Sequence, residues 1–303
     1  MKTILVTGGA GFIGSHIVEH FQDKAHIRVL DNLRTGNLEN LKGLEHKFIH
    51  GDVANSDDVA RAVEGVDYVF HLAALVSVPE SMEKMTECNR INSIGTINLL
   101  EASAKAGVKK LILSSSAAIY GDNPVCPKIE TMFPEPKSPY AITKLDGEYY
   151  CGMFANEGKL QTASLRYFNV FGPRQNPNSA YAAAVPIFIT KALRNEDIVI
   201  FGDGEQTRDF IFVRDIAAAN AYMAENPFTG GCNVAYGGRQ TINELAKKII
   251  RILNSKSKIV YLPERPGDVK HSSACANVLF STGFKPLYDF DKGLEITLES
   301  YKI

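Results

Sequence analysis

Long hydrophobic runs are missing from this sequence of 303 residues. A helix that crosses a bilayer needs about 20 consecutive apolar residues, and no segment comes near that length. The N-terminus is apolar only over Ile4–Val6 before a glycine-rich turn follows. We therefore expect a buried strand there rather than a signal peptide, and no membrane partner.

An excess of charge of one sign is also missing. The 33 Lys and Arg residues nearly balance the 34 Asp and Glu residues, so the formal net charge is −1. The basic residues are scattered along the chain, whereas a nucleic-acid or anionic-membrane site would gather them. We expect no nucleic-acid partner.

Cysteine is scarce, and its spacing carries no motif. There are 5 cysteines, an odd number, and no C-x-x-C pair among Cys88, Cys126, Cys151, Cys232 and Cys275. This pattern argues against a disulfide framework and a cysteine zinc site, and it predicts a reduced, cytoplasmic setting.

A histidine metal site is not expected either. His16 and His20 are four apart in a predicted helix, but two ligands without a third favour a solvated helix face. We predict no metal.

The remaining composition is that of a folded globular protein. Hydrophobic residues make up 45% of the chain and charged residues 22%. The length allows one large domain, or a large and a small one, with an ample core.

Short β-branched runs alternate with helical stretches in the first half. Continuous apolar strands between helices predict an α/β fold with a parallel sheet covered on both faces. The predicted strands are Thr3–Thr7, Arg28–Asp31, Lys47–His50, Tyr68–Leu72, Leu111–Ser115 and Thr162–Tyr167, and the predicted helices are Gly11–Phe21, Ser56–Val63, Met85–Ala106 and Pro139–Ala155.

The texture changes after Tyr167, where loops rich in Gly, Pro and Asn separate shorter helices such as Ala180–Leu193 and Ile242–Leu253. We expect residues 1–168 to form a dinucleotide-binding domain and residues 169–303 mainly a smaller α/β substrate domain. The strand-like Asp209–Val213 and the helix-like Asp215–Glu225 are expected to return to the first sheet within 209–236. The cleft between the two parts is the expected site.

A glycine-rich turn follows the first predicted strand and opens the first helix. Gly8 allows a tight turn, Gly11 lets a pyrophosphate approach the backbone, and Gly14 lets helix and sheet pack closely. Asp31 ends the second strand, where a carboxylate binds ribose hydroxyls and repels a 2′-phosphate. The pattern therefore predicts NAD rather than NADP. Arg34 lies nearby and has two interpretations: it could pair with a 2′-phosphate, or it could be an ordinary solvated loop arginine.

Two further segments could face the cofactor. Asp52 follows the third strand and could bind the adenine amino group; capping the next helix is an equal alternative. Leu72, Ala73 and Ala74 end the fourth strand with small residues that suit a backbone lying against a cofactor.

A possible catalytic trio follows the dinucleotide turn. Tyr140 and Lys144 are four apart at the start of a helix and so share one face. An ammonium beside a phenol lowers the phenol pKa, which would make Tyr140 a usable base. Ser116 ends the fifth strand, at the sheet edge where such folds bind ligands, and could bridge substrate and Tyr140. Each motif alone also occurs by chance; in this order they indicate catalysis.

Four segments together resemble a known family. The segments Thr7–Gly14, Ser114–Gly121, Ser138–Lys144 and Arg166–Gly172 are similar to those of extended short-chain dehydrogenase/reductases. NAD-dependent UDP-sugar 4-epimerases are the nearest members, in particular those that act on UDP-N-acetylhexosamines. The resemblance spans nearly the whole chain and implies a Rossmann-like doubly wound sheet.

The resemblance implies a mechanism. Tyr140 would take the proton of the sugar C4 hydroxyl while the C4 hydride passes to NAD, and the 4-keto sugar would then turn over and take the hydride back. Ser116 would relay the proton, and Lys144 would tune Tyr140 and bind ribose. Phe168 would pack near the nicotinamide, and Asn92 would support the site geometry unless it is an ordinary helix asparagine. The remaining implied cofactor residues are Phe12, Ile13, Asn32, Val53 and Ser114.

The resemblance also implies a UDP site. Asn169, Arg208 and Arg265 match the family's UDP-binding positions, and Asp268 matches its uridine-ribose ligand. Diphosphates need cations and donors of this kind. A homodimer built from the helices Met85–Ala106 and Pro139–Ala155 is implied in the same way.

Small residues mark the expected sugar pocket. Ser272 stands where relatives restricted to glucose carry a bulky tyrosine, and Ala183 is small as well. A serine leaves room for a C2 acetamido group, so we expect tolerance of N-acetylated sugars. Val76 departs from the lysine or glycine common at its position, and the choice between N-acetylated sugars and UDP-glucose stays open.

Other activities of the family fit less well. A 4,6-dehydratase carries an acidic pair after the catalytic hydroxyl, and a UDP-glucuronate decarboxylase usually carries a glutamate in place of Ala118, whereas Ala117 and Ala118 follow Ser116 here. The alternatives left are a 4-epimerase of uronic acids or pentoses, a sugar-nucleotide reductase, and a regulator that senses NAD without catalysis.

Overall fold

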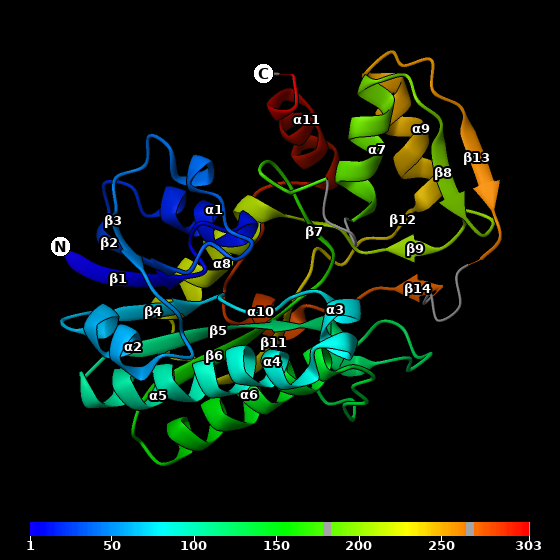
Figure 1. The fold of residues 1–303 in the computed structure, drawn as a ribbon. Helices are drawn as coiled ribbons and strands as arrows, with labels where there is room; N and C mark the ends of the chain where they lie inside the picture. Colours follow the sequence, from blue (N-terminus) through cyan, green and yellow to red (C-terminus); the bar gives the residue numbers. More distant parts are fainter. Residues whose placement is uncertain (178–182, 265–269, 303) are drawn as a thin grey trace.

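A seven-stranded parallel sheet forms the centre of the structure, a computed structural model that describes residues 1–177, 183–264 and 270–302 (Figure 1). Its strand order is β11-β6-β5-β4-β1-β2-β3, and each neighbouring pair is parallel. The strands are β1 (Lys2–Thr7), β2 (Ala25–Asp31), β3 (Lys47–His50), β4 (Tyr68–His71), β5 (Lys110–Ser116), β6 (Gln161–Tyr167) and β11 (Gly230–Val234).

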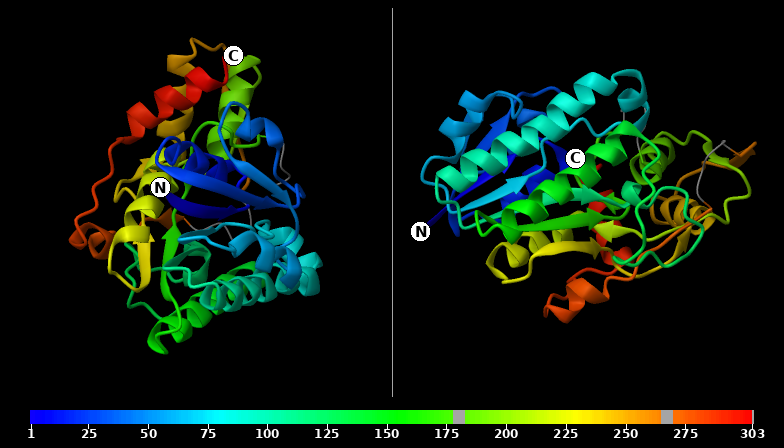
Figure 2. Two further views of the ribbon diagram at one scale, coloured as in Figure 1. Left: turned by 90° about the vertical axis from the view of Figure 1, so that its left-hand side faces the viewer. Right: turned by 90° about the horizontal axis from the view of Figure 1, so that it is seen from below.

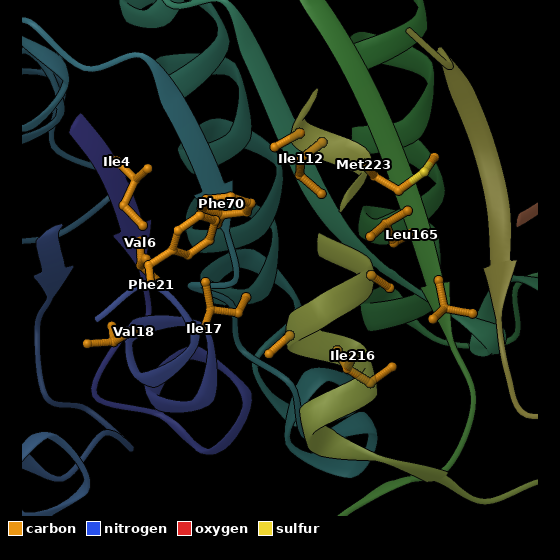
Figure 3. Close-up of a cluster of buried hydrophobic side chains, with 14 of the residues drawn as sticks. Ile4, Val6, Ile17, Val18, Phe21, Phe70, Ile112, Leu165, Ile216 and Met223 are labelled. Carbon is orange, nitrogen blue, oxygen red and sulfur yellow. The ribbon is translucent and has the colours of Figure 1, made fainter. Parts of the chain in front are cut away.

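Helices cover both faces of this sheet. One face packs on α1 (Phe12–His20) and α8 (Val213–Glu225), whose apolar side chains meet those of β1, β4, β5 and β6 (Figure 3). The other face packs on α2 (Ser56–Val63), α5 (Gly95–Lys105) and α6 (Pro139–Asn156). Seen from below, α5 and α6 cross this face side by side (Figure 2). The predicted doubly wound α/β sheet is confirmed.

Shorter connecting elements join these layers. They are η1 (Leu38–Leu41), α3 (Val78–Glu83), α4 (Met85–Asn89), the π-helical turn η2 (Arg90–Ile94), η3 (Ala117–Tyr120) and α10 (Asn277–Ser281).

The rest of the chain builds a second hydrophobic cluster around α7 (Ala184–Leu193), α9 (Ile242–Ile252) and α11 (Phe290–Ser300). Small sheets accompany them: β10-β7, β12-β9-β14 and β13-β8. Their strands are β7 (Val170–Phe171), β8 (Ile198–Phe201), β9 (Thr207–Arg208), β10 (Ile211–Phe212), β12 (Gln240–Thr241), β13 (Ile259–Leu262) and β14 (His271–Ser272). None of the helices in the described residues is long and apolar enough to cross a membrane.

The chain returns to the first sheet within residues 209–236: α8 covers the predicted helix Asp215–Glu225 and packs on that sheet, but the returning strand is not the predicted one. The strand-like Asp209–Val213 does not join that sheet, because β10 pairs with β7 instead. The strand that does return is β11, which pairs with β6. Two of its five residues are glycine and one is asparagine. Because these residues are depleted in strands, strand propensity does not predict β11.

The predicted helix Met85–Ala106 is interrupted. A π-helical turn, Arg90–Ile94, separates α4 from α5. Single π-turns inside helices often occur at functional sites. Asn92 lies in the middle of this turn and is buried.

The pair His16 and His20 is not the solvated face expected from sequence. The His16 side chain is buried, and its Nε2 lies 3.0 Å from the carbonyl oxygen of Pro173. The reason is tertiary packing, because the chain after β7 returns over α1. This contact joins the first part of the chain to the second.

A buried ion pair fixes α6, the helix that carries Tyr140 and Lys144, to the sheet. Arg166 in β6 donates to Glu148 in α6 at 2.7 Å, and the Ser115 hydroxyl at the end of β5 donates to the same carboxylate. The two charged side chains are only 9% and 8% exposed. Removing one partner of such a pair is strongly destabilising, because the other charge stays buried.

Candidate active site

The turn between β1 and α1 closes as tightly as its glycines suggest. Gly8 has φ +70°, and a Cβ at this position would lie 2.7 Å from the backbone nitrogen of Ala73. A Cβ at Gly14 would lie 2.2 Å from the carbonyl oxygen of Gly8. Both contacts are too close for any side chain. The turn therefore lets β4, the loop and α1 approach one another at backbone distance.

The N-terminus of α1 is open to the space in front of the turn. Gly11 is its N-cap residue, and among the described residues no side chain caps the helix. The first N–H groups of a helix lack intrahelical acceptors and carry partial positive charge. Such an end binds the negative oxygens of phosphates.

A cavity of about 370 Å³ opens in front of this turn, at the carboxyl edge of the sheet. In the strand order, β2 and β3 lie on one side of β1, and β4 and β5 on the other, which is where doubly wound sheets bind ligands. Most of the sequence-predicted residues line it: Gly8, Gly11, Phe12, Ile13, Gly14, Asp31, Asn32, Asp52, Val53, Leu72, Ala73, Ala74, Val76, Ser114, Ser116, Tyr140, Lys144 and Asn169.

Asp31 is buried at the wall of the cavity. Its carboxylate accepts hydrogen bonds from the backbone N–H of Ala10 at 3.0 Å and of Leu33 at 2.8 Å. These bonds hold the acidic group between the glycine-rich turn and the loop after β2. A carboxylate in this place can accept ribose hydroxyls with its remaining lone pairs.

The place of Asp52 separates the two sequence interpretations. It lines the cavity, and its Oδ1 accepts from the backbone N–H of Ala54 at 2.9 Å. The next helix, α2, is capped instead by Asn55. Capping by Asp52 is therefore wrong, and its Oδ2 faces Arg90.

Ser116, Tyr140 and Lys144 converge on the same cavity from β5 and α6. Ser138 caps α6 by accepting from the N–H of Ala141, and Pro139 begins the helix, which suits a first turn without a free N–H. The Lys144 Nζ donates to the carbonyl oxygen of Ser114 at 2.7 Å and lies 5.8 Å from the centre of the Tyr140 ring. The helix therefore presents phenol and ammonium together to the end of β5.

The electrostatics of the trio differ from the expectation. Burial raises the pKa of the Tyr140 phenol, and the hydrogen bond with Ser116 opposes this only in part. Burial also lowers the pKa of the Lys144 ammonium to about 8. The net pKa of Tyr140 is therefore raised in the protein alone, because desolvation of the phenolate outweighs the groups that favour it.

Asn92 lies behind the cavity rather than at its wall. Its Nδ2 donates to the Leu75 carbonyl at 3.1 Å and to the Thr143 hydroxyl at 2.9 Å, and its Oδ1 accepts from Leu75 N–H at 2.7 Å. The Thr143 hydroxyl in turn donates to the Tyr140 carbonyl at 2.9 Å. Asn92 therefore fixes the start of α6 in position relative to the loop after β4.

The same chain of hydrogen bonds extends to the glycine-rich turn. The Thr96 hydroxyl donates to the Asn92 carbonyl at 2.6 Å, and His71 Nε2 lies 3.0 Å from Thr96 Oγ1. On its other side His71 Nδ1 lies 2.8 Å from Thr7 Oγ1, which also accepts from the N–H of Ala73. This order requires neutral His71 with its proton on Nε2. The sequence analysis missed His71, whose only signal was its place at a strand end.

Four other predicted residues, all within the described part of the chain, are not among those that line the cavity. Phe168 is buried against Tyr120, with 6.1 Å between the ring centres. Arg208 and Ser272 are register partners in the pairing of β9 with β14. Ala183 is exposed at the start of α7. Arg265 and Asp268 lie outside the described residues.

Asp209, next to Arg208, is a further residue that the sequence analysis missed. Its buried carboxylate accepts from the N–H groups of Tyr236 and Gly237 at 3.2 Å and of Ala274 at 3.3 Å. Burial raises its pKa to about 6. It joins three loops behind Arg208 and Ser272.

Comparison with known proteins agrees with this geometry. Residues 4–236 match the NAD dependent epimerase/dehydratase family. A UDP-N-acetylglucosamine 4-epimerase from Methanobrevibacter ruminantium, solved with UDP-N-acetylmuramic acid, is 44% identical, with a TM-score of 0.95 over 99% of this chain and 98% of its own. A UDP-glucose 4-epimerase from Thermotoga maritima, solved with UDP-glucose, is 40% identical, with a TM-score of 0.94 over 99% and 98%.

A curated relative gives the same picture. A putative UDP-glucose 4-epimerase from Methanocaldococcus jannaschii is 38% identical over 96% of both chains. The expected Rossmann-like fold, the NAD cofactor and the family resemblance are confirmed. The chain belongs to the NAD-dependent epimerase/dehydratase family.

Proposed function

We propose that the protein is a 4-epimerase of UDP-hexoses. The proposal rests on one observation. The glycine-rich start of α1 lines the same cavity as Ser116, Tyr140 and Lys144. Three of the relatives that cover nearly the whole chain are named 4-epimerases and are 38–44% identical, which supports this reaction. We propose both UDP-N-acetylglucosamine and UDP-glucose, with their C4 epimers, as substrates.

The residues of the cavity fit NAD. Gly8, Gly11 and Gly14 line the cavity, so the backbone of the turn faces the space in which a ligand would bind. The open N-terminus of α1 would bind the pyrophosphate, and Asp31 would bind the adenosine ribose. When bound there, oxidised NAD would supply a hydride acceptor and donor for the sugar C4, and its positive charge would favour the phenolate of Tyr140.

The protein groups would then move one proton. Tyr140 would take the proton from the sugar C4 hydroxyl, through the Ser116 hydroxyl, as the hydride leaves, and would return it to the same oxygen when a hydride comes back to the opposite face of C4. Lys144 is held by the Ser114 carbonyl and is charged below a pH of about 8. Its ammonium stabilises the phenolate electrostatically. Between the two steps the 4-keto sugar turns over within the pocket.

We propose that the two parts of the chain divide the work. Residues 1–168, with residues from 209–236, would hold NAD, and residues 169–303 would mainly hold the UDP-sugar. Asn169, Arg208, Arg265, Asp268 and Ser272 are the proposed UDP-sugar residues, with Ala183 and Val76 at the sugar. The register pairing of Arg208 with Ser272 supports placing diphosphate and sugar next to each other.

We also propose a homodimer and a cytoplasmic setting. The helix α6 exposes the large apolar side chains Ile142, Tyr149 and Met153, and the other expected interface segment, Met85–Ala106, exposes Met85 and Ile94. A second copy of these segments would cover them. The cysteine pattern remains the support for a cytoplasmic setting.

The test is incubation of the purified protein with UDP-N-acetylglucosamine, UDP-glucose, a UDP-uronic acid and a UDP-pentose, without added cofactor. We expect the C4 epimer of the two hexoses, and a loss of about a thousandfold in Tyr140→Phe, since acid–base catalysis contributes 10²–10⁴. A reductase would need added reduced cofactor. No conversion of any UDP-sugar, with Tyr140→Phe indistinguishable from wild type, would favour the NAD-sensing regulator.

The substrate pocket has its own test. Ser272→Tyr should abolish turnover of UDP-N-acetylglucosamine and spare UDP-glucose, because the ring would fill the volume that a C2 acetamido group sweeps. Initial rates with both substrates check this. Equal activity of the variant on both sugars would refute the proposed pocket.

A further inference from the structure

Ion pairs connect the two sides of the crevice in which the cavity lies. Arg34 belongs to the loop after β2, and its two Nη atoms meet carboxylates of two different helices. Nη2 lies 2.8 Å from Oε1 of Glu80 in α3, and Nη1 lies 3.0 Å from Oε1 of Glu87 in α4. Both ends of the guanidinium are therefore held.

A third ion pair joins the same two sides of the crevice. Arg90 in η2 lies 3.3 Å from Asp52, which follows β3. Arg34, Asp52 and Ile91, the residue after Arg90, all line the cavity. The three ion pairs thus lie at its rim.

The strand order indicates that these ion pairs cross the opening of the crevice. The loops after β2 and β3 lie on one side of β1, and the segment α3–η2 follows β4 on the other side. Loops on the two sides of such a switch point diverge, and the ligand enters between them. An ion pair across this opening must break, or move, when the two sides separate.

We propose that Arg34, Glu80 and Glu87, together with Arg90 and Asp52, form an ionic clasp that retains NAD by closing the crevice over its adenosine end. The proposal rests on the cofactor site proposed above. A cofactor that is regenerated in each turnover has no need to leave, so slow release suits this reaction.

The clasp also bears on cofactor choice. Arg34 is the cation near Asp31 that could have paired with a 2′-phosphate, yet both of its Nη atoms are engaged by carboxylates. Glu80 and Glu87 would moreover repel a further negative charge. The clasp, like Asp31, therefore favours NAD over NADP.

The strength of the clasp must be modest and sensitive to salt. The side chains of Arg34, Glu80 and Glu87 are 28%, 29% and 40% exposed. Partly exposed pairs are weak one at a time, and salt screens them. Loss of the two pairs of Arg34 should speed NAD release about tenfold.

The test measures NAD release directly. Protein loaded with radiolabelled NAD is chased with an excess of unlabelled NAD, and retained label is followed by filtration. We expect the double variant Glu80→Gln, Glu87→Gln to release label about tenfold faster than wild type. Wild-type release should accelerate with added NaCl, and that of the double variant should respond less.

Lys84→Gln is the matched control. Lys84 pairs with Glu80 at 3.0 Å, but within the same segment, so this pair does not cross the crevice. The control should release NAD like wild type. Equal release rates of the double variant and wild type, equal acceleration in Lys84→Gln, or wild-type release that ignores salt would each overturn the clasp.

Release of NAD is independent of catalysis, so the two proposals can fail separately. A protein that binds NAD but epimerises no UDP-sugar contradicts the proposed function only. One that epimerises, yet shows none of the expected release rates, contradicts the clasp only. Thermal melting of each variant verifies that it is folded.

Discussion

Thr143 is the residue through which the support behind the cavity reaches the catalytic helix. It accepts from Asn92 and donates to the carbonyl of Tyr140. Catalytic groups that must meet a substrate within a fraction of an ångström are sensitive to such supports. Tyr140 is thus positioned by two residues, Asn92 and Thr143, that are not among those lining the cavity.

We predict that Thr143→Val lowers kcat about tenfold and leaves KM nearly unchanged, because the first turn of α6 loses its link to Asn92. Steady-state kinetics with UDP-glucose measures this. Thr162→Val is the control: the Thr162 hydroxyl also donates to a carbonyl of α6, that of Cys151, at 2.8 Å. Both variants should lose about 1 kcal/mol of stability. A similar kcat in the two variants would contradict the positioning role.

The residues of the cavity that have a chemical signature could be predicted from sequence. Gly8 and Gly14 were predictable because no other residue fits their backbone contacts. His71 and Asp209 were not, because a buried polar residue shows its partners only once the chain is folded. The raised pKa of Tyr140 has the same origin, since burial cannot be derived from a four-residue spacing.

At the scale of elements, β4 is tied to β1 and α5 through the ring of His71. Burial lowers the pKa of this histidine from 6.5 to about 3. The unfolded chain therefore binds a proton between these values that the folded protein does not. Stability from this group is complete above pH 6.5 and is lost progressively as the pH falls toward 3.

We predict that the free energy of unfolding falls with decreasing pH more steeply in wild type than in His71→Gln, by up to about 1.4 kcal/mol per pH unit below pH 6. Urea unfolding at pH 7, 5.5 and 4 gives both slopes. Carboxylates such as Glu19 contribute equally to the two proteins, so the difference isolates His71. Identical slopes would show that His71 is not held neutral.

Elements with a clear period or clear boundaries were predictable, and those defined by tertiary contacts were not. The six predicted strands of the sheet and the helices α1, α2 and α6 appear at or near their expected bounds. The strand β11 has no propensity of its own and depends on β6 for its existence. The π-turn at Arg90–Ile94 likewise accompanies the burial of Asn92, which periodicity does not report.

At the scale of the molecule, one apolar face is left uncovered by the part of the chain that the structure describes. Tyr149 is 65% and Met153 43% exposed on α6. Adjacent exposed apolar side chains on one helix face mark interaction sites more often than scattered ones do. The proposed homodimer would bury them.

We predict that Tyr149→Glu, Met153→Glu converts a dimer to a monomer, because two charges per copy would be desolvated at the interface. Size-exclusion chromatography with light scattering measures the mass. Leu287→Glu, which changes a 79% exposed leucine outside α6, should leave the dimer intact. A wild-type protein that runs as a monomer, or a double variant that stays dimeric, would count against this interface.

The central claim is that bound NAD serves as a hydride store, emptied and refilled on the same sugar carbon. The most direct measurement uses UDP-glucose with deuterium at C4, incubated with the purified protein in ordinary water without added cofactor. The account predicts UDP-galactose that retains deuterium at C4, and no such product from Tyr140→Phe. A C4 epimer that has lost its deuterium to solvent, or one that forms only when reduced cofactor is supplied, would contradict it.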